Sequence, residues 1–194
     1  MKPIYTLLFF MFFAFSQKSI AQKNTAVNSG VYISKDDFIN NKLTQEADCQ
    51  DDKEIFKKHN FFMKAEFSII NKGKKITYLK KDIYAYRDCE NTVWRFYNNQ
   101  EYEIMETKAI YIYAIRKIVL VGENIERDPI YYFSHGATGN IEKLTIANLK
   151  EAFKQNKPFG NLLDGTLNAE NTIEAYDSTH KMYEVNYLYK QSVK

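Results

Sequence analysis

A run of alternating apolar and polar residues between Lys81 and Ile115 constrains the fold of this chain more than any other feature. Four short segments of this run alternate, and two or three turn-forming residues separate each segment from the next. A period of two is typical of β-strands, and short polar connections rich in asparagine are typical of antiparallel hairpins. The sequence therefore predicts a β meander in which each strand pairs with the next.

The register of this meander decides which side chains share a face, because a slip of one residue exchanges the two faces of a strand. We expect three-residue loops at 89–91 and 98–100 and a two-residue loop at 107–108. These loops gather the aromatic residues on one face. That face consists of Tyr84, Tyr86, Trp94, Phe96, Tyr102, Ile104, Tyr111 and Tyr113.

The second loop also sets the partners of two glutamates. With three residues in that loop, Arg95 lies opposite Glu103 on the other face of the sheet. A loop shorter by one residue would place glutamates beside Trp94 and Phe96, and for this reason we favour the longer loop.

The N-terminus has the pattern of a secretory signal peptide. Lys2 precedes an apolar run over residues 4–15, and small residues at Ser19 and Ala21 suit a signal peptidase. The run is shorter than the roughly 20 residues that a membrane-spanning helix needs. We expect residues 1–21 to be removed after Ala21, which leaves a periplasmic or secreted protein without a transmembrane span.

Cleavage would leave a chain of balanced charge and ordinary domain size. The 27 basic residues less Lys2 and Lys18 leave 25, against 24 acidic residues. This balance gives no indication of nucleic-acid binding. We expect residues 22–30 to form a flexible leader and residues 31–194 to form a single domain.

The chain has two cysteines, Cys49 and Cys89. Export would place them in an oxidising compartment, where a bridge would add about 4 kcal/mol of stability in the loop-closure model. The sequence alone leaves a bridge and two separate thiols equally open. The three histidines lack the paired spacing of a zinc site, and we expect neither a metal nor a cofactor.

Further strands are predicted on both sides of the meander. Alternation over 61–69 and again over 76–80 predicts a hairpin that turns at Gly73. Residues 130–134 predict one more strand, after a break at Asp128-Pro129.

Helices are expected mainly after these strands. Ser34 and Asp37 have the spacing of a capping box and predict one short early helix. Thr145 is the expected cap of a helix that ends before Pro158. Helical spacing predicts a last helix that starts at Thr172 or Asp177 and ends at Lys190. This order predicts an α+β domain, an antiparallel meander of six or seven strands with C-terminal helices packed on one face.

The loop Ser134–Asn140 is the most suggestive place for chemistry. Ser134 and His135 could be read as nucleophile and base, but neighbouring residues of a strand point to opposite faces. The loop also lacks the lysine and hydroxyl pair of a phosphate-binding loop. A hydrolase with a site near Ser134–Asn140 is therefore the alternative function hypothesis.

The first function hypothesis is a non-enzymatic envelope or secreted module that binds a protein or glycan partner. If the aromatic face is exposed, its binding residues are Tyr84, Tyr86, Trp94 and Phe96. We favour a core role for this face, because the apolar stripes of the predicted helices must be buried on a sheet.

Five segments carry a resemblance, and they read DIYAYRD, WRFYNNQEYEI, AIYIY, YYFS and LTIANLKEAF. In this order and after a signal peptide, they resemble a group of uncharacterised exported proteins of Gram-negative bacteria. The resemblance covers the chain from Val31 to Tyr189 and implies export and a single domain. It implies no activity, ligand or catalytic residue.

Overall fold

The structure is a computed structural model that describes residues 28–49, 56–57, 64–71, 73–121, 124–166 and 173–194. The predicted signal peptide and residues 22–27 of the predicted leader lie outside the described residues. The described residues form an α+β fold built on an eight-stranded antiparallel sheet with the order β11-β10-β9-β8-β7-β6-β1-β2. The predicted fold class is therefore confirmed.

The strands of the large sheet follow the chain closely. They are β1 (Asn28–Tyr32), β2 (Thr44–Asp48), β6 (Ala85–Arg87), β7 (Val93–Tyr97), β8 (Gln100–Thr107), β9 (Ile110–Val121), β10 (Asn124–His135) and β11 (Glu142–Lys143). Two smaller sheets complete the strands. They are the three-stranded sheet of β3 (Phe56–Lys57), β4 (Glu66–Asn71) and β5 (Lys74–Leu79), and the pair β12 (Tyr176–Asp177) and β13 (Met182–Tyr183).

Two helices begin at the predicted caps, whereas the last helix begins at Glu184, later than predicted, because the β12–β13 pair occupies the residues before it. The helices are α1 (Lys35–Ile39), the 3₁₀ turn η1 (Lys80–Asp82), α2 (Ile146–Ala152), α3 (Lys157–Thr166) and α5 (Glu184–Ser192). The Ser34 hydroxyl accepts from the Asp37 amide at 3.1 Å, and the Asp37 carboxylate accepts from the Ser34 amide at 3.0 Å, which is the predicted capping box. Thr145 caps α2 in the same manner.

The first hairpin of the meander has the predicted register. Tyr86 lies opposite Trp94, and Asn91 has a φ of 62°, which a three-residue hairpin loop requires at one position. Asp88 fixes this loop, because its carboxylate accepts from the amides of Glu90 and Thr92 at 3.1 and 2.9 Å.

The second loop differs from the prediction. It contains two residues, Asn98 and Asn99, with φ values of 49° and 62°, which is the pattern of a type I′ turn. The observed pairs across this hairpin are Trp94–Glu103, Arg95–Tyr102, Phe96–Glu101 and Tyr97–Gln100. The predicted three-residue loop at 98–100 is therefore wrong, and the glutamates lie on the face that the prediction kept free of charge.

The third connection is also displaced. β8 ends at Thr107 and β9 begins at Ile110, so the loop occupies 108–109 rather than 107–108. A register shift between Ile104 and Glu106 interrupts the pairing, and Tyr113 lies opposite Ile104. A bulge of this kind adds a residue to one strand, which the alternation of side chains alone does not reveal.

The observed register divides the predicted aromatic face into two. Tyr86 and Phe96 pack with Phe67 and Ile69 of the small β3–β4–β5 sheet. On the opposite face, Tyr102 and Tyr113 form a separate cluster with Ile141. The prediction that the helices cover the whole aromatic set is therefore wrong.

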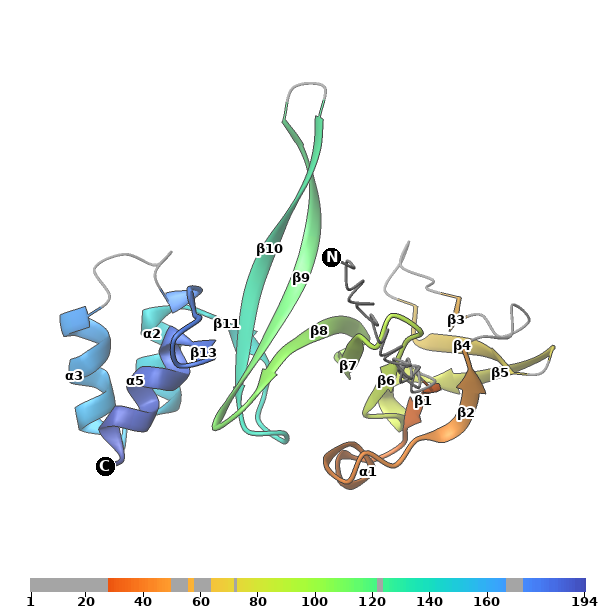
Figure 1. Ribbon diagram of the computed structural model, residues 1–194, viewed down its shortest axis with the longest axis horizontal. Helices are drawn as coiled ribbons and strands as arrows, with labels where there is room; N and C mark the ends of the chain where they lie inside the picture. The colour runs from red at the N-terminus through yellow and green to blue at the C-terminus, as the bar shows by residue number, and fades with distance from the viewer. Residues whose placement is uncertain (1–27, 50–55, 58–63, 72, 122–123, 167–172) are drawn as a thin grey trace, which may run out of the picture.

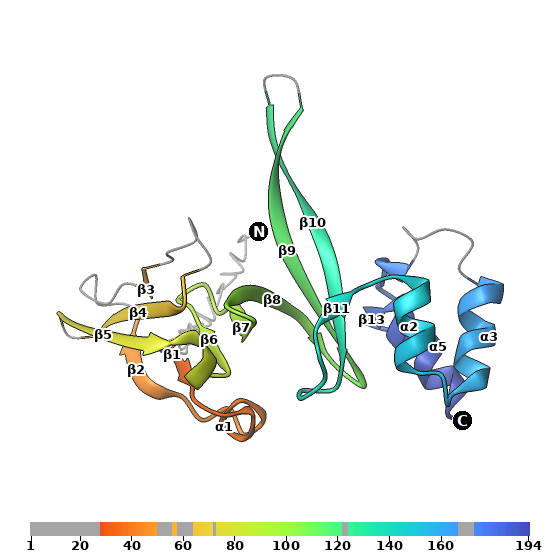
Figure 2. The same ribbon diagram turned by 180° about the vertical axis from the view of Figure 1, so that it is seen from behind.

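The C-terminal helices cover a different part of the sheet. Ile110 and Ile112 of β9 and Phe133 of β10 form one core with the apolar stripes of α2, α3 and α5. Figure 1 shows these helices gathered beside the β9–β10 hairpin at one end of the molecule, with the small sheet at the other end. Figure 2 shows the same arrangement from behind, with the hairpin extending beyond both groups.

Two boundaries differ from the predictions. β1 begins at Asn28, and Ser29 and Gly30 are buried, so residues 28–30 of the predicted leader belong to the sheet. β10 runs through Pro129, which lies opposite Arg116, although the sequence predicted a break there. β11 pairs only with Tyr132 and Phe133, so Pro129 lies on an edge that has no neighbouring strand in the described part of the chain.

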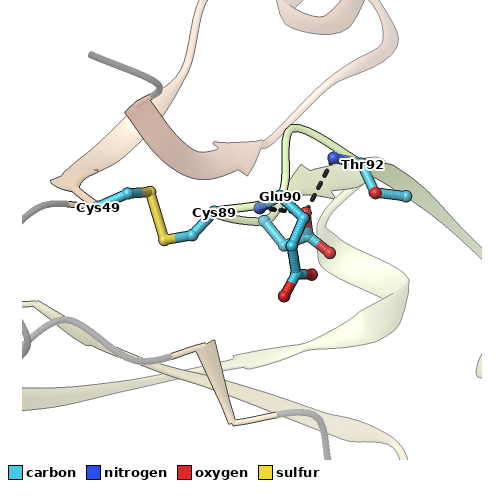
Figure 3. The surroundings of a disulfide bond; sticks show 5 residues. Cys49, Cys89, Glu90 and Thr92 are labelled. Carbon is cyan, nitrogen blue, oxygen red and sulfur yellow. Dashed lines mark hydrogen bonds between the residues drawn. A yellow bond between two sulfur atoms is a disulfide. The ribbon is translucent and has the colours of Figure 1, made fainter. Parts of the chain in front are cut away.

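Cys49 and Cys89 form a disulfide, with 5.4 Å between their Cα atoms. Figure 3 shows that the bridge joins the end of β2 to the loop between β6 and β7. The bridge thus connects the edge of the large sheet to the first hairpin of the meander. None of the described helices is long and apolar enough to cross a membrane.

Candidate functional site

The four aromatic residues named from the sequence do not form one exposed surface. Tyr86 is fully buried and Phe96 is 7% exposed. The ring centroid of Phe67 lies 4.6 Å from that of Tyr86 and 5.2 Å from that of Phe96. Trp94 is half-buried, and its indole N–H donates to Asp88 at 2.9 Å. Tyr86 and Phe96 are therefore core residues. They were expected to bind a ligand only if exposed, and they are buried.

Tyr84 belongs to a different environment. It is half-buried and packs with Phe38 of α1, with 5.4 Å between the ring centroids. Its hydroxyl donates to the carbonyl oxygen of Ala137 at 2.9 Å. Tyr84 therefore joins α1 to the loop that follows β10, and its ring lies beside Arg95.

Ser134 and His135 point to opposite faces of β10, as strand alternation requires. Ser134 is fully buried, and its hydroxyl donates to the carbonyl oxygen of Gly136 at 2.7 Å. His135 is exposed, and its ring lies 4.7 Å from the ring of Phe153 on the helix side. The two residues do not form a nucleophile and base pair.

The most unusual group in the described residues is the guanidinium of Arg95, a residue that is only 5% exposed. Nη1 of Arg95 donates to the hydroxyl of Tyr113 at 2.6 Å and to the hydroxyl of Ser134 at 3.3 Å. Nη2 donates to the carbonyl oxygen of Gly139 at 3.1 Å. These contacts come from β9, β10 and the following loop, so the fold positions Arg95 from several elements.

Three tyrosine rings surround the same guanidinium. Its central carbon lies 5.1 Å from the ring centroid of Tyr84, 5.6 Å from that of Tyr113 and 5.8 Å from that of Tyr97. Such cation–π contacts contribute about 0.5 to 2 kcal/mol each. The rings therefore compensate part, but not all, of the cost of burying a charge.

No carboxylate pairs with Arg95 among the residues that the structure describes. A guanidinium has five N–H groups, of which Arg95 uses three in the hydrogen bonds above. The remaining two are on Nε and on Nη2. Nε is a buried atom without a hydrogen-bond partner in the described part of the chain. One edge of the Arg95 guanidinium is thus buried without an acceptor in the part of the chain that the structure describes.

The two glutamates nearest in the meander already have partners. Glu101 pairs with Lys80 at 3.0 Å and accepts from the Tyr86 hydroxyl at 3.1 Å. Glu103 accepts from Nε of Arg116 at 3.0 Å. Both glutamates lie on the face of the sheet opposite Arg95, because the two-residue loop at Asn98 and Asn99 places them there.

A pocket of about 600 Å³ adjoins Arg95. Three segments line it, residues 33–35, 80–84 and 95–99. Lys35 and Lys81 lie in these segments, and their contacts with Asp36 and Asp82 are exposed pairs of the kind that contribute little. The lining therefore offers more positive than negative charge around a buried guanidinium.

The tyrosines of this cluster are held in the neutral form. Desolvation by burial raises the pKa of Tyr84 and of Tyr113 above the usual value, and the nearby charge of Arg95 lowers both in part. On the other face, burial and then the carboxylate of Glu101 raise the pKa of Tyr86. Neutral hydroxyls can accept from the guanidinium without adding a negative charge to it.

Two further pockets in the described part of the chain are lined by neither lysine nor arginine. One of about 520 Å³ lies between His135, Phe153 and Tyr189, and one of about 460 Å³ lies beside the end of β8. Within the described residues, no group of three or more histidine, cysteine, aspartate or glutamate side chains could hold a metal ion.

Comparison with protein-family models, with curated proteins and with solved structures finds no match to this chain.

Sequence reasoning did not find the Arg95 site, because it paired Arg95 with Glu103. The signal that could have corrected the register is the pair Asn98-Asn99, since asparagine is among the residues that accept the positive φ of a type I′ turn. With that turn in place, Arg95 faces Tyr102 and loses its predicted acid.

Proposed function

We propose that this chain is an exported, non-enzymatic binding module that holds an oxyanion group of its ligand at Arg95. The observation that carries this proposal is a buried guanidinium whose Nε has no hydrogen-bond partner and which has no carboxylate partner among the described residues. A buried charge is expensive unless it is paired, and an oxyanion from a ligand would supply the missing partner.

The free edge of Arg95 has the right shape for such a group. Nε and Nη2 project two N–H bonds on the same side of a planar group, and this fork matches two oxygens of a carboxylate or phosphate. Lys35 and Lys81 would attract the anion to the pocket. Because Nε is covered in the unbound protein, the anion reaches it only when a ring of the lining turns aside, and half-buried Tyr97 is the ring we expect to move.

Export belongs to the same proposal. The signal pattern of residues 1–21 and the resemblance to exported Gram-negative proteins support a periplasmic or secreted location. The Cys49–Cys89 disulfide is compatible with the oxidising compartments in which such proteins reside.

The proposal is tested by unfolding the full mature chain in denaturant at increasing acetate concentration, with ionic strength held constant by sodium chloride. A ligand that binds only the folded state stabilises it by about 1.4 kcal/mol at ten times its dissociation constant. We expect a saturable stabilisation in the unmodified protein and in Arg116→Lys, the matched control, since Arg116 is exposed and paired with Glu103.

Arg95→Lys keeps the charge but loses the fork, so the saturable part should disappear. Equal stabilisation of the unmodified protein and of Arg95→Lys would contradict the proposal, and so would the absence of any saturable effect with acetate and with inorganic phosphate.

A further inference from the structure

We infer that the oxyanion is the carboxylate of an acidic sugar, an inference that rests on the proposed function and names its ligand. Three features of the pocket support this inference. They are the N–H groups of Arg95 that make no hydrogen bond, the tyrosine rings beside the guanidinium and the polar side chains of the rim.

The donors of Arg95 match a carboxylate better than a phosphate. Two N–H groups in one plane satisfy the two oxygens of a carboxylate, whereas a phosphate has further oxygens that need donors or cations. The other cations near Arg95 are less suited to that task. Lys80 is occupied by Glu101 and by the carbonyl oxygen of Asn99, Lys35 pairs with Asp36, and Lys81 is exposed.

The rings beside the guanidinium suit the body of a sugar. Tyr84 and Tyr97 both line the pocket and both are half-buried, so each has some accessible ring surface. The C–H groups of a sugar ring pack on aromatic surface of this kind. A carboxylate bound at Arg95 would bring the attached sugar ring within reach of both tyrosines.

The rim of the pocket suits sugar hydroxyls, which both donate and accept hydrogen bonds. Asn98 and Asn99 supply exposed amides that do both, and Asp82 supplies an exposed acceptor. A peptide carboxyl terminus would favour an apolar side-chain pocket or a free strand edge. The polar rim therefore favours a glycan over a peptide.

The inference is tested by competition and direct titration of the full mature chain with four probes, which are glucuronate, acetate, glucose and inorganic phosphate. We expect glucuronate to bind at least about tenfold more tightly than acetate, because ring stacking and hydroxyl contacts add to the carboxylate contact. Glucose should bind more weakly than glucuronate, because it lacks the group that pairs with Arg95.

A double variant, Asn98→Gly with Asn99→Gly, separates the sugar contacts from the anion contact. Glycine accepts the positive φ of both positions, so the turn is kept while both amides are removed. This variant should bind acetate as the unmodified protein does and should lose at least about threefold in glucuronate affinity. Asn91→Gly is the matched control, since Asn91 has a φ of 62° in a loop that does not line this pocket.

The outcomes distinguish the two levels of the proposal. If acetate and glucuronate bind equally well through Arg95, or if phosphate binds best, the sugar inference is overturned and the oxyanion site remains. Tighter binding of a short peptide with a free carboxyl terminus than of glucuronate would also overturn it. If no probe binds, both the sugar inference and the proposed function are wrong.

Discussion

Two buried cations on opposite faces of β7 have very different surroundings. Lys80 is 4% exposed and Arg95 is 5% exposed, so both are withdrawn from water to the same degree. Lys80 pairs with a buried carboxylate, Glu101, and its ammonium lies 5.4 Å from the ring centroid of Phe96. Arg95 has three tyrosine rings and neutral acceptors, and no carboxylate in the described part of the chain.

The difference separates a structural charge from a charge that is available to a ligand. The Lys80–Glu101 pair is complete, so removing one of its members should damage the fold. Arg95 has no carboxylate partner in the described part of the chain, so its replacement should affect ligand binding more than the stability of the fold.

The largest effect is expected at Glu101. Glu101→Leu leaves Lys80 buried with only the carbonyl oxygen of Asn99 as a partner, and removing one member of a buried pair costs about 3 to 5 kcal/mol. Denaturant unfolding measures this loss. Adding Lys80→Met to Glu101→Leu should recover most of it, because no unpaired charge then remains.

An exposed pair provides the control for Glu101→Leu. Lys150 and Asp164 lie 2.7 Å apart on the surface, and Asp164→Asn should cost less than about 1 kcal/mol. A loss at Glu101 as small as this would show that Lys80 and Glu101 are not a structural pair.

The second effect concerns the disulfide, which lies away from both charges. Replacing Cys49 and Cys89 together by serine should lower the free energy of unfolding by about 2 to 4 kcal/mol. The saturable response to acetate should survive, since neither cysteine lines the Arg95 pocket. If the double serine variant lost the response to acetate, that response would depend on the stability of the fold rather than on binding at Arg95.

The third effect is a pH dependence that arises from buried tyrosines. Burial raises the folded-state pKa of Tyr86 and of Tyr84 above the unfolded value of about 10. Above pH 10 the unfolded state releases these protons while the folded state keeps them, so stability falls as the pH rises.

Each such tyrosine should contribute up to about 1.4 kcal/mol per pH unit to this fall. Unfolding free energies measured from pH 9 to 11 should therefore decline less steeply in Tyr86→Phe and in Tyr84→Phe. An unchanged slope in either variant would show that its hydroxyl titrates normally in the folded protein.

The smallest effect on stability is expected at Arg95 itself. Arg95→Met removes a buried charge without a carboxylate partner, and this gain should offset the loss of its hydrogen bonds and ring contacts, so the free energy of unfolding should change by less than about 1 kcal/mol. The measurement is the same denaturant titration. A loss of about 3 kcal/mol or more would make Arg95 a structural residue like Lys80 and would remove the basis of the comparison.

Local signals in the sequence were sufficient for much of this fold. The meander, the caps at Ser34 and Thr145 and the hairpin at Gly73 depend on residues that are close in sequence, and the structure contains all of them. The α+β class followed from the order of these elements.

Long-range contacts explain what the sequence did not reveal. Glu101 is tolerated beside Phe96 only because η1 brings Lys80 to it, and nothing in the alternation of β8 signals that partner. The acceptors of Arg95 come from Ser134 and Gly139, which are 39 and 44 residues away in the chain. A buried charge without an acid could therefore be recognised only after the strands were in register.

The most direct test of the central claim is the nuclear magnetic resonance signal of the Arg95 side-chain Nε–H in protein labelled with nitrogen-15. This group is buried and has no hydrogen-bond partner within the described residues, so a carboxylate that binds there should shift its resonance. Nε of Arg87 is also buried without such a partner but does not line the pocket, so its signal should shift less. Titration with glucuronate should move the Arg95 signal in a saturable manner, while the Nε–H of Arg116, which donates to Glu103 at 3.0 Å, should remain in place. An Arg95 signal that stays fixed while glucuronate and acetate are raised to saturating concentrations would contradict the account.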